Sequence, residues 1–228
     1  MTKSIMAFQT SETLPAHIMA GTTLGNENVS ADDMAVPQLG LIQSLSPELK
    51  KSDSKYIKGA EVGHIFNKVT GETFENIFVV NLKYESIFTI FRKREKGGGF
   101  EGNYETQASA EQHMADEGLS PDEHQIVDTA IHTVACLDEN GRHNQIARIY
   151  MSNSNKKVSD AWNTAIANMQ TDRFAKVWVL SSAEETNRRG QAYQVFKTTD
   201  GGFADEALYN ESRSAYFAMK GMADPTIH

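Results

Sequence analysis

The chain has 228 residues, of which 39% are hydrophobic and 23% charged, as expected for an ordinary globular protein. Its formal net charge of −8 argues against a surface covered with DNA-binding cations, and its one cysteine, Cys136, excludes an intramolecular disulfide and a cysteine-based zinc cluster. No run approaches the roughly 20 apolar residues of a membrane helix, so we expect a cytoplasmic protein that makes no use of a membrane.

The first part of the chain predicts an arm followed by a β region. Residues 1–35 are rich in Thr, Ser, Asn, Asp and Gly with weak periodicity, which indicates a loosely ordered arm with a short helix at 31–34. Pro37 begins a short apolar stretch over 38–45, and residues 46–51 predict a turn. Residues 64–74 predict a β-hairpin with its turn at Thr70 and Gly71.

Residues 77–93 form a long run with strand-like alternation. Side chains of a strand point alternately to its two faces, so an unbroken register divides the run into a core face and a mixed face. Because most strands have 3–10 residues, we expect a bend near Glu85 and Ser86. The predicted core face carries Phe78, Val80, Leu82, Tyr84, Phe88 and Ile90, and the mixed face carries Asn81, Lys83, Glu85, Ile87, Thr89, Phe91 and Lys93.

The remaining elements follow from turn residues and helical spacing. A helix over 108–117 ends at Gly118, strands over 126–137 and 144–151 flank a turn at 138–141, and a helix opens at 154. A second hairpin pairs 174–182 with 191–198, and a last helix covers 204–220. The apolar face of the helix that opens at 154 consists of Val158, Ala161, Trp162, Ala165, Ile166 and Met169.

This order of elements predicts a mainly β fold with helices. A helix placed before the last two strands matches the five-stranded OB barrel, which binds oligonucleotides across one sheet face and its loops. We therefore expect an OB-like antiparallel β-barrel domain over residues 36–200, with an acidic helical excursion at 101–128. Residues 201–228 are expected to form a C-terminal helix and a short tail.

Charge is unevenly distributed beside the long strand. Residues 101–128 hold eight carboxylates and no lysine or arginine. Three glycines, Gly97 to Gly99, separate this segment from the basic cluster, which consists of Arg92, Lys93, Arg94 and Lys96. Local fields decide where a polyanion docks, whereas net charge mainly affects solubility and steering. We hypothesise that the acidic segment folds over the basic cluster and competes with a bound polyanion.

Aromatic residues interleaved with cations indicate a site for single-stranded nucleic acid, because rings stack on bases and cations follow phosphates. Each candidate has an alternative structural role: a basic strand end also protects a sheet edge, and an aromatic ring also packs in a core. Lysines in a first helical turn and arginines at a hairpin tip either bind an anion or simply face solvent. The predicted nucleic-acid-binding residues are Lys83, Phe91, Arg92, Lys93, Arg94, Lys96, Phe100, Tyr104, Lys156, Lys157, Arg188 and Arg189.

The sequence does not favour catalysis. It contains no HExxH pattern and no nucleophile elbow, and the glycines at 97–99 are not followed by the residues of a phosphate-binding P-loop. His113 has helical spacing to Asp116 and Glu117, but chance explains this better than a metal site in so acidic a segment. We predict no catalytic residue, no metal and no cofactor.

Three segments together carry a family resemblance: the strand over 78–94, the helix KKVSDAWNTAIA, and the closing hairpin FAKVWVLSSAEETNRRGQAYQVFK. With these segments the chain resembles phage-type single-stranded DNA-binding proteins of the OB-fold class. The resemblance implies sequence-independent binding of single-stranded DNA during phage replication or recombination, in the host cytoplasm, with replication or recombination proteins as partners. It leaves the oligomeric state open, homo-oligomers included.

One feature departs from that class, whose members usually end in an acidic tail that recruits partners. This chain ends KGMADPTIH, with Asp224 as its only acidic residue, so the tail function is either absent or taken over by residues 101–128. The alternative function is a phage structural or protein-interaction module without DNA binding. A metal-dependent nuclease is a third and less favoured hypothesis.

Overall fold

The computed structural model describes residues 24–25 and 35–222 of the chain. It divides the chain into two units, Met1–Ala35 and Val36–His228, and the elements below all belong to the second. The predicted helix at 31–34 and the last six residues lie outside the described part.

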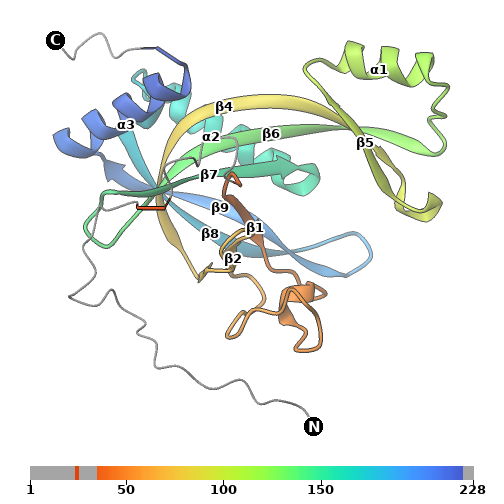
Figure 1. The fold of residues 1–228 in the computed structure, drawn as a ribbon, viewed down its shortest axis with the longest axis horizontal. Coiled ribbons are helices and arrows are strands. Elements are labelled where there is room, and N and C mark those ends of the chain that lie inside the picture. Colours follow the sequence, from red (N-terminus) through yellow and green to blue (C-terminus); the bar gives the residue numbers. More distant parts are fainter. Residues whose placement is uncertain (1–23, 26–34, 223–228) are drawn as a thin grey trace. The chain divides into compact units, whose positions relative to one another are not determined.

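A single sheet of nine strands dominates the described part of the second unit (Figure 1). Its strand order is β3-β2-β1-β7-β6-β4-β8-β9, and β5 adds to the free part of the β4 edge. Neighbours pair antiparallel except β1 and β7, which are parallel. The strands are β1 (Gln38–Leu41), β2 (Ile65–Asn67), β3 (Thr73–Phe74), β4 (Ile77–Arg92), β5 (Gly99–Tyr104), β6 (His124–Leu137), β7 (His143–Ser152), β8 (Lys176–Thr186) and β9 (Ala192–Phe203); the helices are α1 (Gln107–Asp116), α2 (Lys156–Asn168) and α3 (Glu206–Met219).

The sheet curls into a half-barrel around α2. Trp162 and Ile166 of α2 are buried against inward-facing residues from most of the strands, including Val79, Ile149 and Leu180. The stripe on α2 is narrower than predicted, since Ala161 and Ala165 are exposed. Placing the helix on the concave face buries the apolar stripe of the helix and the apolar face of the sheet at once.

Gln43, which follows β1, links β1 to the edge strand β9 across the curled sheet. Its side-chain Nε2 donates to the carbonyl oxygen of Gln194 on β9 at 2.9 Å, and its Oε1 accepts from the Gln194 backbone N–H at 2.8 Å. The amide thus imitates one rung of a β-ladder where no strand pairing exists. On the same edge, Asn155 Oδ1 accepts from the backbone N–H of Phe196 at 2.7 Å.

The long strand β4 agrees with prediction in extent but not in register. The pairing with β6 shifts between Asn81 and Lys83, so the irregularity lies earlier than the expected bend at Glu85 and Ser86. A bulge of this kind inserts one extra residue and reverses the alternation beyond it. Asn81 before the shift and Tyr84 after it therefore both face the α2 side.

The predicted core face of β4 was wrong in part. Val80, Leu82 and Ile90 are fully buried, but Phe78 is 49% exposed, because α3 covers the outer face of the sheet only from Val80 onward. Asn81 and Thr89, expected on the mixed face, are 0% and 4% exposed. Each has a hydrogen-bonding partner, as buried polar groups require: Asn81 bonds to His132, and Thr89 donates to Asn103.

The other two helices cover opposite ends of β4 (Figure 1). α3 packs through Leu208 over Val80 and Leu82, whereas α1 packs through Ala110 and Met114 over Ile90. The helix and hairpin predictions from turn residues are confirmed for α1, α3, the β2–β3 turn at Gly71, the β6–β7 pair and the β8–β9 pair. The sheet has nine strands among the described residues, more than the five expected.

Replacing Gln43 with Leu tests the amide link between β1 and β9. Two neutral hydrogen bonds are lost, each worth about 0.5–1.5 kcal/mol, so we expect the free energy of unfolding to fall by about 1–3 kcal/mol. Urea denaturation measures this change. Gln125→Leu is the control, because Gln125 is exposed and should change stability by no more than about 0.5 kcal/mol. Equal effects of the two substitutions would contradict a role for Gln43 in closing the sheet.

Candidate functional site

The middle of β4 has a partner strand on one side only. On the edge opposite β6, residues 77–80 pair with β8 and residues 88–92 pair with β5, which leaves residues 81–87 without a ladder on that edge. The bulge next to Leu82 lies at the start of this gap. Bulges and ladder interruptions often lie beside binding sites because they re-aim side chains.

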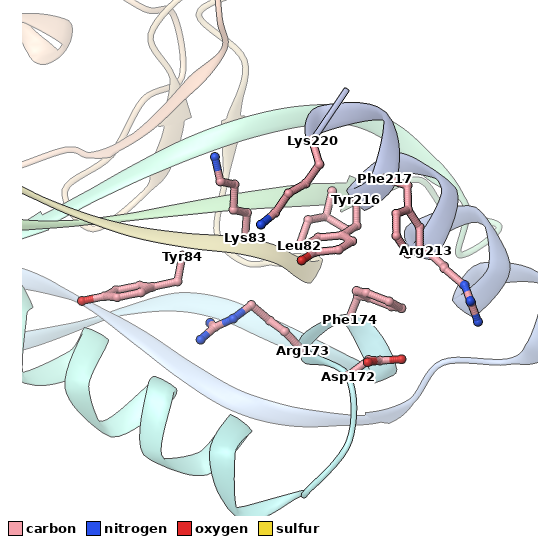
Figure 2. A pocket seen from close by; sticks show the side chains of 10 residues that line it. All are labelled: Leu82, Lys83, Tyr84, Asp172, Arg173, Phe174, Arg213, Tyr216, Phe217 and Lys220. Carbon is pink, nitrogen blue, oxygen red and sulfur yellow. The ribbon is translucent and has the colours of Figure 1, made fainter. Parts of the chain in front are cut away.

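A pocket of about 460 Å³ opens at this gap, between β4, the short 3-10 helix Arg173–Ala175 and α3 (Figure 2). Its lining has four cations and one carboxylate, which gives a formal charge of +3 in a chain of net charge −8. It also has four aromatic rings. The lining residues are Lys83, Arg173, Arg213 and Lys220, with Asp172, then Tyr84, Phe174, Tyr216 and Phe217, and Leu82.

Four of these side chains come from one face of α3 and the residue after it. Arg213, Tyr216, Phe217 and Lys220 are spaced i, i+3, i+4 and i+7, which places them together along a helix. Each cation lies over a ring: Arg213 Cζ is 5.7 Å from the centroid of Phe217, and Lys220 Nζ is 5.6 Å from that of Tyr216. Figure 2 shows Tyr216 and Lys220 extending from α3 toward Lys83, whereas Arg213 points away from Lys83.

Arg173 is the most constrained cation of the pocket. Its guanidinium donates to Asn81 Oδ1 at 3.3 Å and to Asn163 Oδ1 at 3.0 Å, and lies 5.5 Å from the Tyr84 ring centroid. Amide oxygens orient a guanidinium without cancelling its charge, and no carboxylate of the described residues lies within ion-pair distance of it. The neighbouring Asp172 accepts instead from the Tyr209 hydroxyl.

Burial lowers the pKa of Arg173 from its ordinary value, but an arginine remains charged in a protein. A partly buried cation held only by neutral groups is costly unless a counter-charge arrives. The pocket is therefore electrostatically suited to an anionic ligand.

A buried polar chain supports Arg173 from the core. The Asn81 side-chain Nδ2 donates to His132 Nδ1 at 2.9 Å, so His132 carries its proton on Nε2 and donates it to Ser159 Oγ at 2.8 Å. The ring stacks on Trp162 at 4.6 Å between centroids. Burial, followed by the charge of Arg173, lowers the pKa of His132 to about 3, so the ring is neutral and adds no second positive charge beside the guanidinium.

The predicted nucleic-acid-binding residues do not form one surface. Lys83 lines the pocket and also forms an ion pair with Glu85 at 2.8 Å. In the basic cluster, Arg92 pairs with Glu123 at 3.5 Å and Lys93 donates to the Pro121 carbonyl at 2.8 Å, while Lys96 is exposed. Arg94 begins a 3-10 turn, and its side chain lies outside the described part.

Two predicted rings do come together, and one does not. Phe91 and the 62% exposed Phe100 meet edge-to-face at 6.2 Å and line a groove of about 320 Å³ with Lys68, Tyr150 and Asn103. Tyr104 instead packs in the small core beneath α1 and lies 5.1 Å from the His113 ring. Its partly buried ring therefore has the core-packing role that is the alternative to stacking on a base.

The peripheral cations divide into paired and exposed residues. Lys156 pairs with Asp160 at 2.7 Å and Asp128 at 3.3 Å, and Lys157 pairs with Glu185 at 2.6 Å, so both already hold carboxylates. These hydrogen bonds raise the pKa of both lysines. Arg188 and Arg189 are exposed in the turn between β8 and β9.

Sequence reasoning missed most of the pocket. The α3 face was detectable, because cations and aromatics share one helical face at 213, 216, 217 and 220. Arg173 was not detectable in this way, because its role depends on Asn81, which lies 92 positions away in the chain. Tyr84 had been assigned to the core, and the β4 bulge turns it toward Arg173.

Comparison with known proteins identifies the family. The model of the Pam3 phage gp34-like protein family matches residues 8–224. The chain belongs to this family. Membership indicates a phage protein, and the family description names no activity. Neither the curated proteins nor the solved structures contain a match.

Among the described residues, no helix is long and apolar enough to cross a membrane. These residues also contain no group of three or more His, Cys, Asp or Glu side chains placed to hold a metal ion.

The depressed pKa of His132 predicts a loss of stability in acid. Between an unfolded pKa of 6.5 and a folded pKa of about 3, the unfolded chain binds the additional proton, so stability falls as the pH drops through this window. Relative to His132→Gln, the natural chain should lose about 1.4 kcal/mol of unfolding free energy per pH unit below 6. Urea denaturation between pH 7 and 4.5 measures the difference, and parallel curves for the two proteins would contradict a neutral buried ring.

Proposed function

We propose that this protein binds single-stranded DNA without sequence preference and acts in phage DNA replication or recombination. The observation that carries the proposal is the pocket beside β4, in which Arg173 keeps an uncancelled charge among four aromatic rings. Phosphates are ligands for the cations, and bases can stack on the rings, each stacked base contributing about 1–3 kcal/mol.

The composition of the pocket supports sequence-independent binding. The lining offers four rings on which bases can stack and four cations that can contact phosphates. Stacking and phosphate contacts accept every base. The groove with Phe91 and Phe100 offers a second stacking surface on the same long strand.

The order of elements also agrees with the OB-fold proposal. α2 lies inside a curled sheet and precedes the closing hairpin β8–β9, which is the feature on which the likeness to OB-fold DNA-binding proteins rested. The extra strands β1, β2, β3 and β5 extend the sheet beyond a five-stranded barrel.

Arg173→Met tests the proposal. Loss of a charge-assisted phosphate contact should weaken binding of labelled oligo-dT about tenfold or more and should reduce the salt slope by about 0.7. Anisotropy of the labelled oligonucleotide, measured across salt concentrations, reports both. Intrinsic fluorescence is less suitable because Trp162 and Trp178 are buried.

Arg142→Met is the matched control. Arg142 is already neutralised by two hydrogen bonds to Asp205, at 2.9 and 3.0 Å, and lies outside the pocket, so its loss should change affinity little. Equal effects of the two substitutions on oligo-dT affinity would show that the pocket is not the DNA-binding site. Salt-independent or undetectable binding by the natural chain would favour the alternative, a phage structural or protein-interaction module.

The acidic segment gives a separate prediction about affinity. Removing residues 101–128 would also remove most of β5, all of α1 and the start of β6, so a single substitution is the sharper test. Glu123→Gln releases Arg92 from its ion pair and should tighten oligo-dT binding about two- to fivefold at low salt. Unchanged affinity, with Glu139→Gln as an exposed control, would show that Glu123 does not mask the basic cluster.

A further inference from the structure

A further, largely apolar cavity is lined by residues of α1, of the loop after it and of the start of β6. α1 lies at the end of β4 opposite α3 (Figure 1). The volume of the cavity is about 430 Å³. Met114, Leu119 and Ile126 belong to the core beneath α1 and also line this cavity, so the core opens to the surface here. The remaining lining residues are Glu111, Ala115, Pro121, His124 and Gln125.

The walls of this cavity, which we call the α1 groove, are held by local hydrogen bonds. Thr106 caps α1 in a reciprocal bond pair with Ser109, and Gly118 ends the helix with φ +63°. The Leu119 backbone N–H donates to the Met114 carbonyl at 2.8 Å, the 6→1 bond of a helix C-terminus. Lys93 fixes the following loop through the Pro121 carbonyl. A groove that is formed in advance loses little entropy when a ligand enters.

The surroundings of the α1 groove are strongly acidic. Of the eight carboxylates in residues 101–128, three have ion-pair partners: Glu101 with His124, Glu123 with Arg92, and Asp128 with Lys156. The other five have no ion-pair partner among the described residues. They are Glu105, Glu111, Asp116, Glu117 and Asp122, all exposed on or beside α1.

This combination limits what can occupy the α1 groove. Five carboxylates without an ion-pair partner repel a nucleic acid. The single-stranded DNA proposed to bind in the pocket beside β4 therefore does not extend to the α1 groove. The chain's own residues 1–34 are also disfavoured, because they carry one cation, Lys3, against four carboxylates. An apolar floor with Glu111 in its wall and four further carboxylates on or beside α1 complements a segment that has apolar residues on one side and Lys or Arg on the other.

We propose that the α1 groove docks a basic, amphipathic segment of another protein. Apolar side chains of that segment cover Met114, Leu119 and Ile126, and its cations meet Glu111 and the neighbouring carboxylates. The proposal is independent of DNA binding, because it uses other residues at the other end of β4.

A model peptide tests this docking. A labelled helical peptide of Leu and Lys, roughly 15 residues long, is compared with a Leu and Glu peptide of the same length by anisotropy on the full chain. The basic peptide should bind saturably and the acidic one should not. Glu111→Lys should weaken binding about fivefold, and Leu119→Ser about tenfold.

Matched controls separate the α1 groove from general charge and from unfolding. Glu139→Lys makes the same charge change at an exposed turn between β6 and β7, and Val69→Ser makes a similar polar change at an exposed site; both should leave peptide affinity unchanged. Leu119→Ser could loosen the packing beneath α1, but Glu111 is exposed, so its substitution tests the proposal without disturbing that packing. Oligo-dT affinity should be the same in Leu119→Ser, which changes no charge, and the natural chain.

Three results would overturn the proposal. The first is equal weakening by Glu111→Lys and Glu139→Lys, which would indicate attraction to net charge only. The second is absence of saturable binding by the basic peptide. The third is self-association in sedimentation experiments that is abolished by Leu119→Ser, which would identify a second copy of the chain as the occupant.

Discussion

The structure depends on one constraint, the change of neighbours along β4. This strand of 16 residues pairs with β6 almost throughout, but its other edge pairs first with β8 and then with β5. A single sheet cannot hold two partners on one edge without an interruption between them. The bulge at Leu82, in the ladder with β6, lies at the start of that interruption. The two faces of β4 are buried, one against α2 and one against α3. The pocket lined by Lys83 and Arg173 opens beside the part of β4, residues 81–87, that has no partner on this edge.

Local electrostatics oppose the net charge of the chain. The chain is acidic as a whole, yet the lining of the pocket is positive, because Arg173 is oriented by the amide oxygens of Asn81 and Asn163 rather than by carboxylates. The neutral His132 behind Asn81 keeps this arrangement free of a second buried charge. The excess of acidic residues lies around α1 at the other end of β4, so the two fields act on separate surfaces.

Much of the element order was predictable because its signals are local. Turn residues such as Gly71, Gly118, Gly141 and Gly221 mark where strands and helices end, and helical spacing identified α2. The phase of β4 was not predictable, because a bulge depends on which strands pair on either side and leaves no local signature at Leu82. The exposure of Phe78 was not predictable either, because the sequence does not show how far along β4 the helix α3 covers the sheet.

For the site, the residue types are visible in the sequence: cations interleaved with aromatics on β4, and the cations and rings that share one face of α3. The concentration of negative charge in residues 101–128 is visible there too. Which cations keep their charge uncancelled depends on the folded structure. Lys156 and Lys157 meet carboxylates, whereas Arg173 meets amides, and these partners come from distant parts of the chain. Electrostatic interactions depend on distance in space, and folding sets that distance through contacts that sequence separation does not reveal.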